Sequence, residues 1–329
     1  MNFLLVGDTH FVDSPLDFYR WEIFDVLKKS SIEHQIDFIL FLGDTIDRKD
    51  KHTAKLVYRF IDELTDLKFE TQTEVAILSG NHDKPVEGPY YWQFLSKFNI
   101  PYITTPQLLH DHIWLLPYSH SPISDWEGLD ISSKHTIMMH QTIAGAMIEC
   151  DRVLTSAHKL PKLPTKMIFS GDVHRPQTVG DVIYVGTPHP IKFSESWANR
   201  IILIKNSDFS NPIDIWLDGM QRQILKISSF DELNELELPD KIQIKLQYIL
   251  KSDQLGNWAV TQQKIRQWAE EKKINLVSLE TQLEGRGIQT EDHESLEIMS
   301  SDEIIREFGK QENLPDDVVN IGIELLKET

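Results

Sequence analysis

The first 175 residues contain five short apolar runs, and each run ends in polar side chains that commonly bind metals. The runs are LLVGDTH ending at His10, ILFLGDTIDR ending at Arg48, VAILSGNHD ending at Asp83, TIMMHQ ending at Gln141 and MIFSGDVH ending at His174. Short runs that are apolar throughout are typical of strands covered on both faces. Segments with helical apolar spacing separate the first runs, over 17–35, 53–67 and 90–98. This alternation predicts a layered α/β domain.

Strand-like runs follow one another without clear helices from residue 111 onward, at 113–117, 136–139, 167–169, 182–185 and 201–204. Consecutive strands predict a second sheet packed on the first. Beyond residue 218 the pattern changes to an alternating strand over 241–249, an amphipathic helix over 258–273 and a further strand over 274–283. We therefore expect three parts: residues 1–218, a small α+β domain over 219–285, and C-terminal helices over 286–329.

Composition and charge bear on where the protein works but do not decide its function. No run approaches the 18 apolar residues of a membrane span, and MNFLLV is too short for the core of a signal peptide. The single cysteine, Cys150, cannot form an internal disulfide. These features favour the cytoplasm. The net charge of −18 is unlike that of a free nucleic-acid-binding domain. Bound metal ions would offset part of it, and a basic partner subunit could supply phosphate contacts.

The side chains at the run ends predict a metal site, because the carboxyl ends of strands are where open α/β sheets place their ligands. The candidates mix carboxylate, amide and imidazole groups: Asp8, His10, Asp44, Asn81, His140, Asp172 and His174. Taken singly, Gly-Asp and Gly-Asn are ordinary turn residues. A mixed imidazole and carboxylate set suits manganese, iron or zinc. Seven ligands are too many for one ion and fit two ions that share a carboxylate, about 3.5–4 Å apart.

These motifs resemble the signature of the calcineurin-like metallophosphoesterases in order and spacing. They are Asp8-x-His10, Gly43-Asp44-x-x-Asp47-Arg48, Gly80-Asn81-His82-Asp83, the isolated His140 and Gly171-Asp172-x-His174. Within that superfamily the chain resembles the SbcD-type DNA repair exonucleases, the nuclease subunits that work with an SbcC-type coiled-coil ATPase, and among them a phage member. The supporting segments are His140-Gln141, Tyr184-Val-Gly-Thr-Pro188 and the small C-terminal domain.

The resemblance implies a four-layer α/β/β/α sandwich with a small C-terminal α+β capping domain. It implies one ion held by Asp8, His10, Asp44 and His174, and a second held by the bridging Asp44 with Asn81, His140 and Asp172. His82 would protonate the leaving oxygen, with Asp83 and Asp47 orienting the site. The two ions would be manganese, with magnesium possible. The family usually has a histidine where Asp172 stands, so the metal at the second position is an open question.

Substrate and partner contacts are less clearly marked in the sequence. Arg175 and Arg48 are candidate phosphate contacts, and a solvated loop is an equal reading of the Arg48 cluster. His189 fits either a phosphate contact or a loop histidine. We expect DNA as substrate, an SbcC-type ATPase as partner and a homodimer formed through the helices over 53–67 and 90–98. The alternatives are a stand-alone metallophosphoesterase acting on small phosphoesters or phosphoproteins, and a non-catalytic scaffold.

Overall fold

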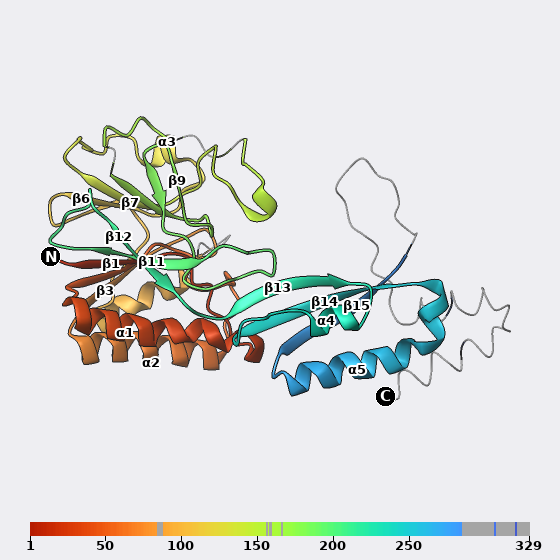
Figure 1. The fold of residues 1–329 in the computed structure, drawn as a ribbon. Coiled ribbons are helices and arrows are strands. Elements are labelled where there is room, and N and C mark those ends of the chain that lie inside the picture. The colour runs from red at the N-terminus through yellow and green to blue at the C-terminus, as the bar shows by residue number, and fades with distance from the viewer. Residues whose placement is uncertain are drawn as a thin grey trace. The chain divides into compact units, whose positions relative to one another are not determined.

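The computed structural model describes residues 1–83, 88–155, 157, 160–165, 167–284, 306 and 320. The chain divides into two units, Met1–Met220 and Gln221–Thr329 (Figure 1). Apart from Arg306 and Asn320, the predicted C-terminal helices over 286–329 lie outside the described residues. No helix within the described ranges is long and apolar enough to cross a bilayer.

The first unit contains a six-stranded sheet whose middle strands are the first three apolar runs. Its order is β12 (Ile213–Leu217), β11 (Asn199–Ile204), β1 (Phe3–Val6), β2 (Phe38–Phe41), β3 (Glu74–Leu78) and β4 (Tyr102–Ile103). Strands β1 to β4 are parallel, whereas β11 runs antiparallel to both of its neighbours. Because parallel strands point the same way, the residues that follow β1, β2 and β3 meet at one edge of the sheet.

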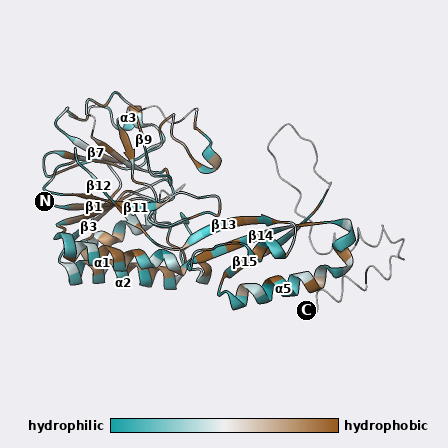
Figure 2. Cartoon of the chain, viewed as in Figure 1, coloured by the Kyte–Doolittle hydropathy of each residue, from teal (hydrophilic) through white to brown (hydrophobic). Residues whose placement is uncertain are grey.

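Helices cover the outer face of this sheet. They are the 3-10 helix η1 (Pro15–Glu22), α1 (Ile23–His34), α2 (Ala54–Thr71) and the 3-10 helix η2 (Tyr91–Phe98). Helix α2 buries Leu56, Phe60, Leu64 and Leu67, one per turn, against the sheet. Thr53 caps it by accepting a hydrogen bond from the amide of Leu56 at 3.1 Å. Figure 2 shows hydrophobic residues concentrated in the strands and alternating with polar ones along α1 and α2.

A second six-stranded sheet packs on the first and contains four of the five strands predicted beyond residue 111. The fifth, over 201–204, is instead β11 of the first sheet, where it pairs with β1. Its order is β5 (Gln107–Leu109), β6 (Ile113–Leu116), β7 (Thr136–His140), β8 (Ile168–Gly171), β10 (Val182–Tyr184) and β9 (Gln177–Val179). The core between the sheets joins Phe3 and Leu40 to Met138 and Phe169, all of them fully buried. The outer face is covered by the short helix α3 (Pro122–Asp125), loops and the 3-10 turn η3 (Glu149–Asp151). The predicted layered sandwich is confirmed.

The second unit is a small α+β structure. The predicted strand, helix and strand are present as β14 (Ile242–Leu250), α5 (Trp258–Glu271) and β15 (Asn275–Leu283). A further strand, β13 (Gln221–Ile227), pairs with β14, so that three parallel strands form the sheet. The short helices α4 (Asp231–Asn234) and η4 (Ser252–Asn257) connect them. Trp258, Ile265 and Trp268 of α5 are buried in its core.

Candidate metal centre

Two groups of potential metal ligands lie at the shared edge of the two sheets. Within the described ranges one group is Asp8, Asp44 and His140, and the other is His10, Asp47 and His82. In each group the candidate ligand atoms lie within 4.8 Å of one another. The first group draws on the ends of β1, β2 and β7, so residues from both sheets meet there.

The carboxylate of Asp44 belongs to the first group and also faces the second. One oxygen, Oδ2, is 3.7 Å from Nε2 of His10, and the other, Oδ1, is 3.4 Å from Nε2 of His140. Oδ1 also accepts a hydrogen bond from the backbone amide of His82 at 2.8 Å. A single carboxylate therefore faces both ligand groups, as a residue that bridges two ions must do.

Three histidines of the centre share one orientation. In each, Nδ1 faces an acceptor: the Leu42 carbonyl at 2.6 Å for His140, Glu195 Oε1 at 2.6 Å for His174, and Asp47 Oδ1 at 3.5 Å for His10. A proton on Nδ1 makes the first two contacts hydrogen bonds, whereas Nδ1 of His10 has no hydrogen-bond partner among the residues that the structure describes. With the proton on Nδ1, the lone pair of each Nε2 is directed into the centre. Anchoring the outer nitrogen of an imidazole in this way is how proteins orient metal-bound histidines.

The inward-facing atoms include too many acceptors to satisfy one another. Nε2 of His10 and Nε2 of His174 are 3.2 Å apart, so two lone pairs meet when both rings carry their proton on Nδ1. Oδ2 of Asp8 is buried and has no hydrogen-bond partner among the residues that the structure describes. Buried acceptors without donors are costly, and a divalent cation among them removes that cost.

The surroundings of Asn81 also indicate a cation, next to Asp44 and His140. Its side-chain oxygen lies 3.0 Å from Nε2 of His140. Turning the amide would let its nitrogen donate to the two Asp44 oxygens at 2.8 and 3.0 Å. In the unturned orientation an amide oxygen, a carboxylate and an imidazole nitrogen converge, which is a ligand set for manganese or a similar ion. The residues present therefore fit two divalent ions.

The buried carboxylates of the centre are stabilised in their charged form by nearby positive charge. Burial raises the pKa of Asp8 above its usual value. Burial also acts to raise the pKa of Asp44, but His140 and the other nearby histidines hold it below its usual value. Burial acts to lower the pKa of His140, yet the Asp44, Asp8 and Asp172 carboxylates raise it well above its usual value. Protons and metal ions compete for such a site, because ligands must lose their protons to bind metal.

The backbone around the ligands is strained. His10, Asp44 and Asp172 have φ values of 43°, 47° and 73°, in the left-handed region that residues with a Cβ rarely adopt. Glycines make room beside them: a Cβ on Gly43 would lie 2.2 Å from Nδ1 of His140, and one on Gly80 would lie 2.1 Å from Oδ1 of Asp44. Such strain persists where the surrounding structure fixes it, commonly at functional sites.

The family model for calcineurin-like phosphoesterases matches residues 1–176, which is more than half of the chain. The chain belongs to this family. Among solved structures, the nuclease MPE of Pseudomonas putida is similar at 15% sequence identity, over 65% of this chain and 87% of that chain, with a TM-score of 0.30. A search of curated proteins found no match.

Asp172, which the resemblance implies as a ligand of the second ion, lies beside His140 and Asp8. Its Oδ1 is 3.6 Å from Nε2 of His140, and its backbone amide donates to Oδ1 of Asp8 at 3.0 Å. Its other oxygen accepts a hydrogen bond from the Thr142 hydroxyl at 2.5 Å. One carboxylate oxygen of Asp172 is thus oriented by Thr142 while the other faces the centre.

The side chain of His82 is oriented by the loop of the second motif. Its Nδ1 lies 2.6 Å from the backbone carbonyl of Asp47, and its ring centroid is 4.7 Å from that of His10. Asp83 is buried and accepts hydrogen bonds from the Gly80 amide at 2.9 Å and the Thr45 hydroxyl at 3.4 Å. Burial, together with the charge of Asp44, raises the pKa of Asp83 to about 7. These contacts indicate that Asp83 shapes the turn, whereas the Asp47 carbonyl orients the His82 ring.

The two predicted substrate contacts lie on the protein surface. Nη1 of Arg175 is 2.5 Å from Oδ1 of Asp151, and its guanidinium lies 5.9 Å from the Trp197 ring centroid. Arg48 is exposed, and its side chain has no ion pair within the described part of the chain. Arg175 is therefore occupied by an acidic partner, whereas Arg48 faces solvent.

Glu195 is the main residue of the centre that the motifs do not reveal. Its side chain is buried, and while Oε1 holds Nδ1 of His174, Oε2 accepts the Ile191 amide at 2.6 Å. Burial acts to raise the pKa of Glu195, but the hydrogen bond from His174 holds it below its usual value. Glu195 lies in a loop 21 residues after His174, without periodicity or motif to mark it.

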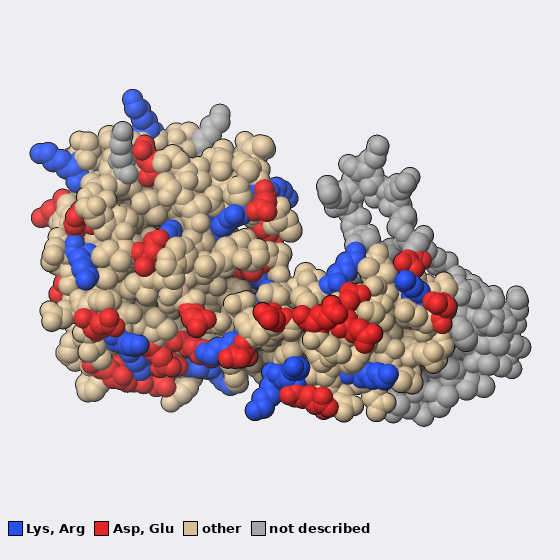
Figure 3. All heavy atoms as spheres, in the orientation of Figure 1, with Lys and Arg blue, Asp and Glu red and all other residues tan. Residues whose placement is uncertain are grey.

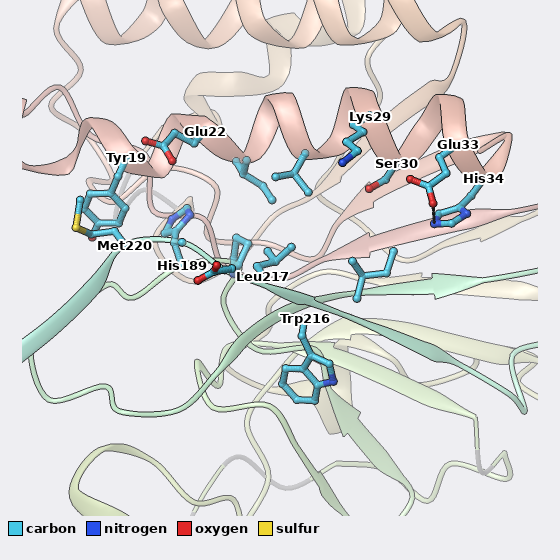
Figure 4. A pocket seen from close by; sticks show the side chains of 16 residues that line it. Tyr19, Glu22, Lys29, Ser30, Glu33, His34, His189, Trp216, Leu217 and Met220 are labelled. Carbon is cyan, nitrogen blue, oxygen red and sulfur yellow. Dashed lines mark ion pairs between the residues drawn. The ribbon is translucent and has the colours of Figure 1, made fainter. Parts of the chain in front are cut away.

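His189 is buried next to the loop that carries Asp8 and His10. It lines a cavity of about 320 Å³ between α1 and β12, where its ring lies near that of Tyr19 (Figure 4). Nε2 of His189 lies 2.8 Å from the carbonyl of Thr9, which stands between two candidate ligands in the sequence. Of the two readings of His189, the structure supports the loop histidine.

Proposed function

We propose that this chain is a metal-dependent DNA exonuclease and endonuclease subunit that hydrolyses phosphodiester bonds with two divalent ions, preferably manganese. One observation carries the proposal: the Asp44 carboxylate faces both ligand groups, at 3.7 Å from His10 and 3.4 Å from His140. Membership of the calcineurin-like phosphoesterases supports hydrolysis of a phosphoester.

Residues of the chain orient the His82 ring and supply the proton for the leaving oxygen. When bound, the two ions would activate a water molecule and neutralise charge on the phosphoryl oxygens. The Asp47 carbonyl accepts the Nδ1 proton of His82 and so fixes the ring, which leaves Nε2 as the other ring nitrogen. We assign to Nε2 of His82 the delivery of a proton to the leaving oxygen. Buried Asp8 and Asp44 supply negative charge, which keeps the ions in place.

DNA as substrate and an SbcC-type ATPase as partner follow from the finer sequence resemblance. We place the protein in the cytoplasm, and the same resemblance makes this the cytoplasm of a bacterium or of a phage-infected host. A homodimer through α2 and η2 is supported by exposed aromatic side chains on both helices: Tyr58 and Phe69 on α2, Tyr91 and Phe98 on η2. Exposed apolar groups gathered on neighbouring elements are typical of surfaces that become buried on assembly.

The test compares substrates on one purified preparation. With manganese, the protein should degrade linear duplex or single-stranded DNA and should also hydrolyse bis(4-nitrophenyl) phosphate. Hydrolysis of the small diester without cleavage of DNA, even with the ATPase present, would favour a stand-alone phosphoesterase. Loss of both activities in a folded, metal-loaded protein would favour a scaffold, against which the presence of His82 argues.

A further inference from the structure

A short basic segment stands out in this acidic chain. Residues 48–59 contain five lysines and arginines and one aspartate, although the whole chain has a net charge of −18. The basic residues are Arg48, Lys49, Lys51, Lys55 and Arg59. On the face drawn in Figure 3, acidic and basic side chains are mixed and form no broad basic area. A local concentration of positive charge is therefore unusual for this protein.

The segment begins beside the metal centre, and contacts fix the chain at Asp47 and at His52. It follows Asp47, whose carbonyl holds the His82 ring. Five residues after Asp47, the centroid of the His52 ring lies 4.4 Å from that of Tyr91 and 5.0 Å from that of Trp92. Residues 48–51, between these two anchors, are all exposed. The backbone that carries these residues thus begins beside the His82 ring, and their side chains are open to solvent.

The charges on α2 are arranged against the helix dipole. Lys55 and Arg59 occupy its first turns, where negative charge is favoured, and the acidic side chains come later: Asp62, Glu63 and Asp66. Asp13 pairs with Lys55 at 2.9 Å and partly offsets this cost. Both cations also lie over the exposed ring of Phe18, at 4.8 and 5.4 Å from its centroid. Arg59 pairs with Glu63 at 3.6 Å and lies 4.4 Å from the Trp21 ring centroid, so both cations have partners within the protein. A lysine has three donors and an arginine five, so each keeps donors for a ligand with negative charge.

We propose that residues 48–59, the basic segment, bind the sugar-phosphate backbone of DNA on the His82 side of the metal centre. This inference rests on the proposed function and adds the path of the strand to it. Lys55 and Arg59 are one helical turn apart, about 6 Å along the axis, and a DNA strand advances about 3.4 Å per phosphate. The pair therefore matches phosphates about two nucleotides apart. Lys49 and Lys51 lie on the segment between this pair and His82.

The experiment measures the salt dependence of DNA binding by the full chain. Lys49→Ala/Lys51→Ala is compared with Lys134→Ala/Lys205→Ala, which removes two exposed lysines from other loops. Both are made in a His82→Ala background with manganese, so that DNA is bound without being cut. Each lost phosphate contact lowers the slope of log affinity against log salt by about 0.9 on duplex DNA. The Lys49/Lys51 variant should therefore lose about 1.8 in slope and on the order of 50-fold in affinity at about 0.1 M salt.

The outcomes separate this inference from the proposed function. A lower slope in the Lys49/Lys51 variant alone, with a reduced ratio of DNA cleavage to bis(4-nitrophenyl) phosphate hydrolysis when His82 is present, supports the basic segment. Equal slopes in both double variants and the His82→Ala parent would overturn it while leaving a DNA nuclease intact. If the parent fails to bind DNA and the wild type hydrolyses only the small diester, the proposed function and the basic segment both fall.

Discussion

Replacing Glu195 by glutamine tests how the first ion is held. The two carboxylate oxygens of Glu195 accept hydrogen bonds from Nδ1 of His174 and from the Ile191 amide, each at 2.6 Å. A glutamine offers one oxygen and one NH₂ group in nearly the same volume. Whichever way the amide turns, its NH₂ faces a donor, so one of the two contacts becomes repulsive. The His174 ring then loses its fixed orientation without any large change in packing.

The expected magnitude follows from the role of that contact. Removing a partner that orients a metal-bound histidine typically weakens metal binding about 10- to 100-fold. This corresponds to about 1.4 to 2.7 kcal/mol, within the range for hydrogen bonds to charged groups. Because Glu195 is buried, solvent screening does not diminish the effect. Turnover at saturating manganese should recover to within a few-fold, since Glu195 contacts no residue to which we assign a proton transfer.

The assay is a manganese titration of phosphodiester hydrolysis, with direct binding by calorimetry. The matched control is Glu74→Gln, which makes the same replacement at an exposed ion pair with Lys68 and should leave manganese affinity unchanged. Unaltered manganese affinity in a folded Glu195→Gln protein would refute the assignment of His174 as a ligand that Glu195 orients.

Three further substitutions probe other parts of the centre. Asp172→His replaces a hard ligand with a softer one, so turnover with magnesium should fall relative to turnover with zinc, as rates with each metal would show. Gly80→Ala would place a Cβ 2.1 Å from Oδ1 of Asp44, so hydrolysis should fall on the order of 100-fold, together with metal content measured by elemental analysis. Asp151→Ala frees Arg175 from its acidic partner, and the KM for DNA should fall by up to about fivefold, or remain unchanged if Arg175 does not contact substrate.

The convergence of the candidate ligands could be predicted because the geometry of parallel strands places them together. Asp8, Asp44 and Asn81 follow β1, β2 and β3, which are neighbours in one parallel sheet. Apolar runs mark those strands clearly, so the residues after them were identifiable without contact information. The same reasoning places His140 at the end of β7, although only the fold shows that its Nδ1 is held by the Leu42 carbonyl, just after β2.

Other features depend on contacts that no local pattern encodes. Glu195 and His189 act through loops that meet the centre only in three dimensions. Strand β13 is not marked in the sequence because it begins with three polar residues, QRQ, and so lacks the apolar alternation of β14. The segment over 17–35 reads as one helix in the sequence, but the structure has a 3-10 helix that begins at Pro15 and passes into α1. Helix type within a continuous pattern is decided by local packing rather than by apolar spacing.

The most direct test of the central claim counts the ions that support cleavage. Protein stripped of metal is titrated with manganese, and both bound ions and DNA cleavage are followed. We predict that cleavage reaches its maximum at two ions per chain, and that His82→Ala binds two ions but cleaves about 10²- to 10⁴-fold more slowly. Full cleavage with a single ion per chain, or wild-type cleavage by His82→Ala, would contradict the account.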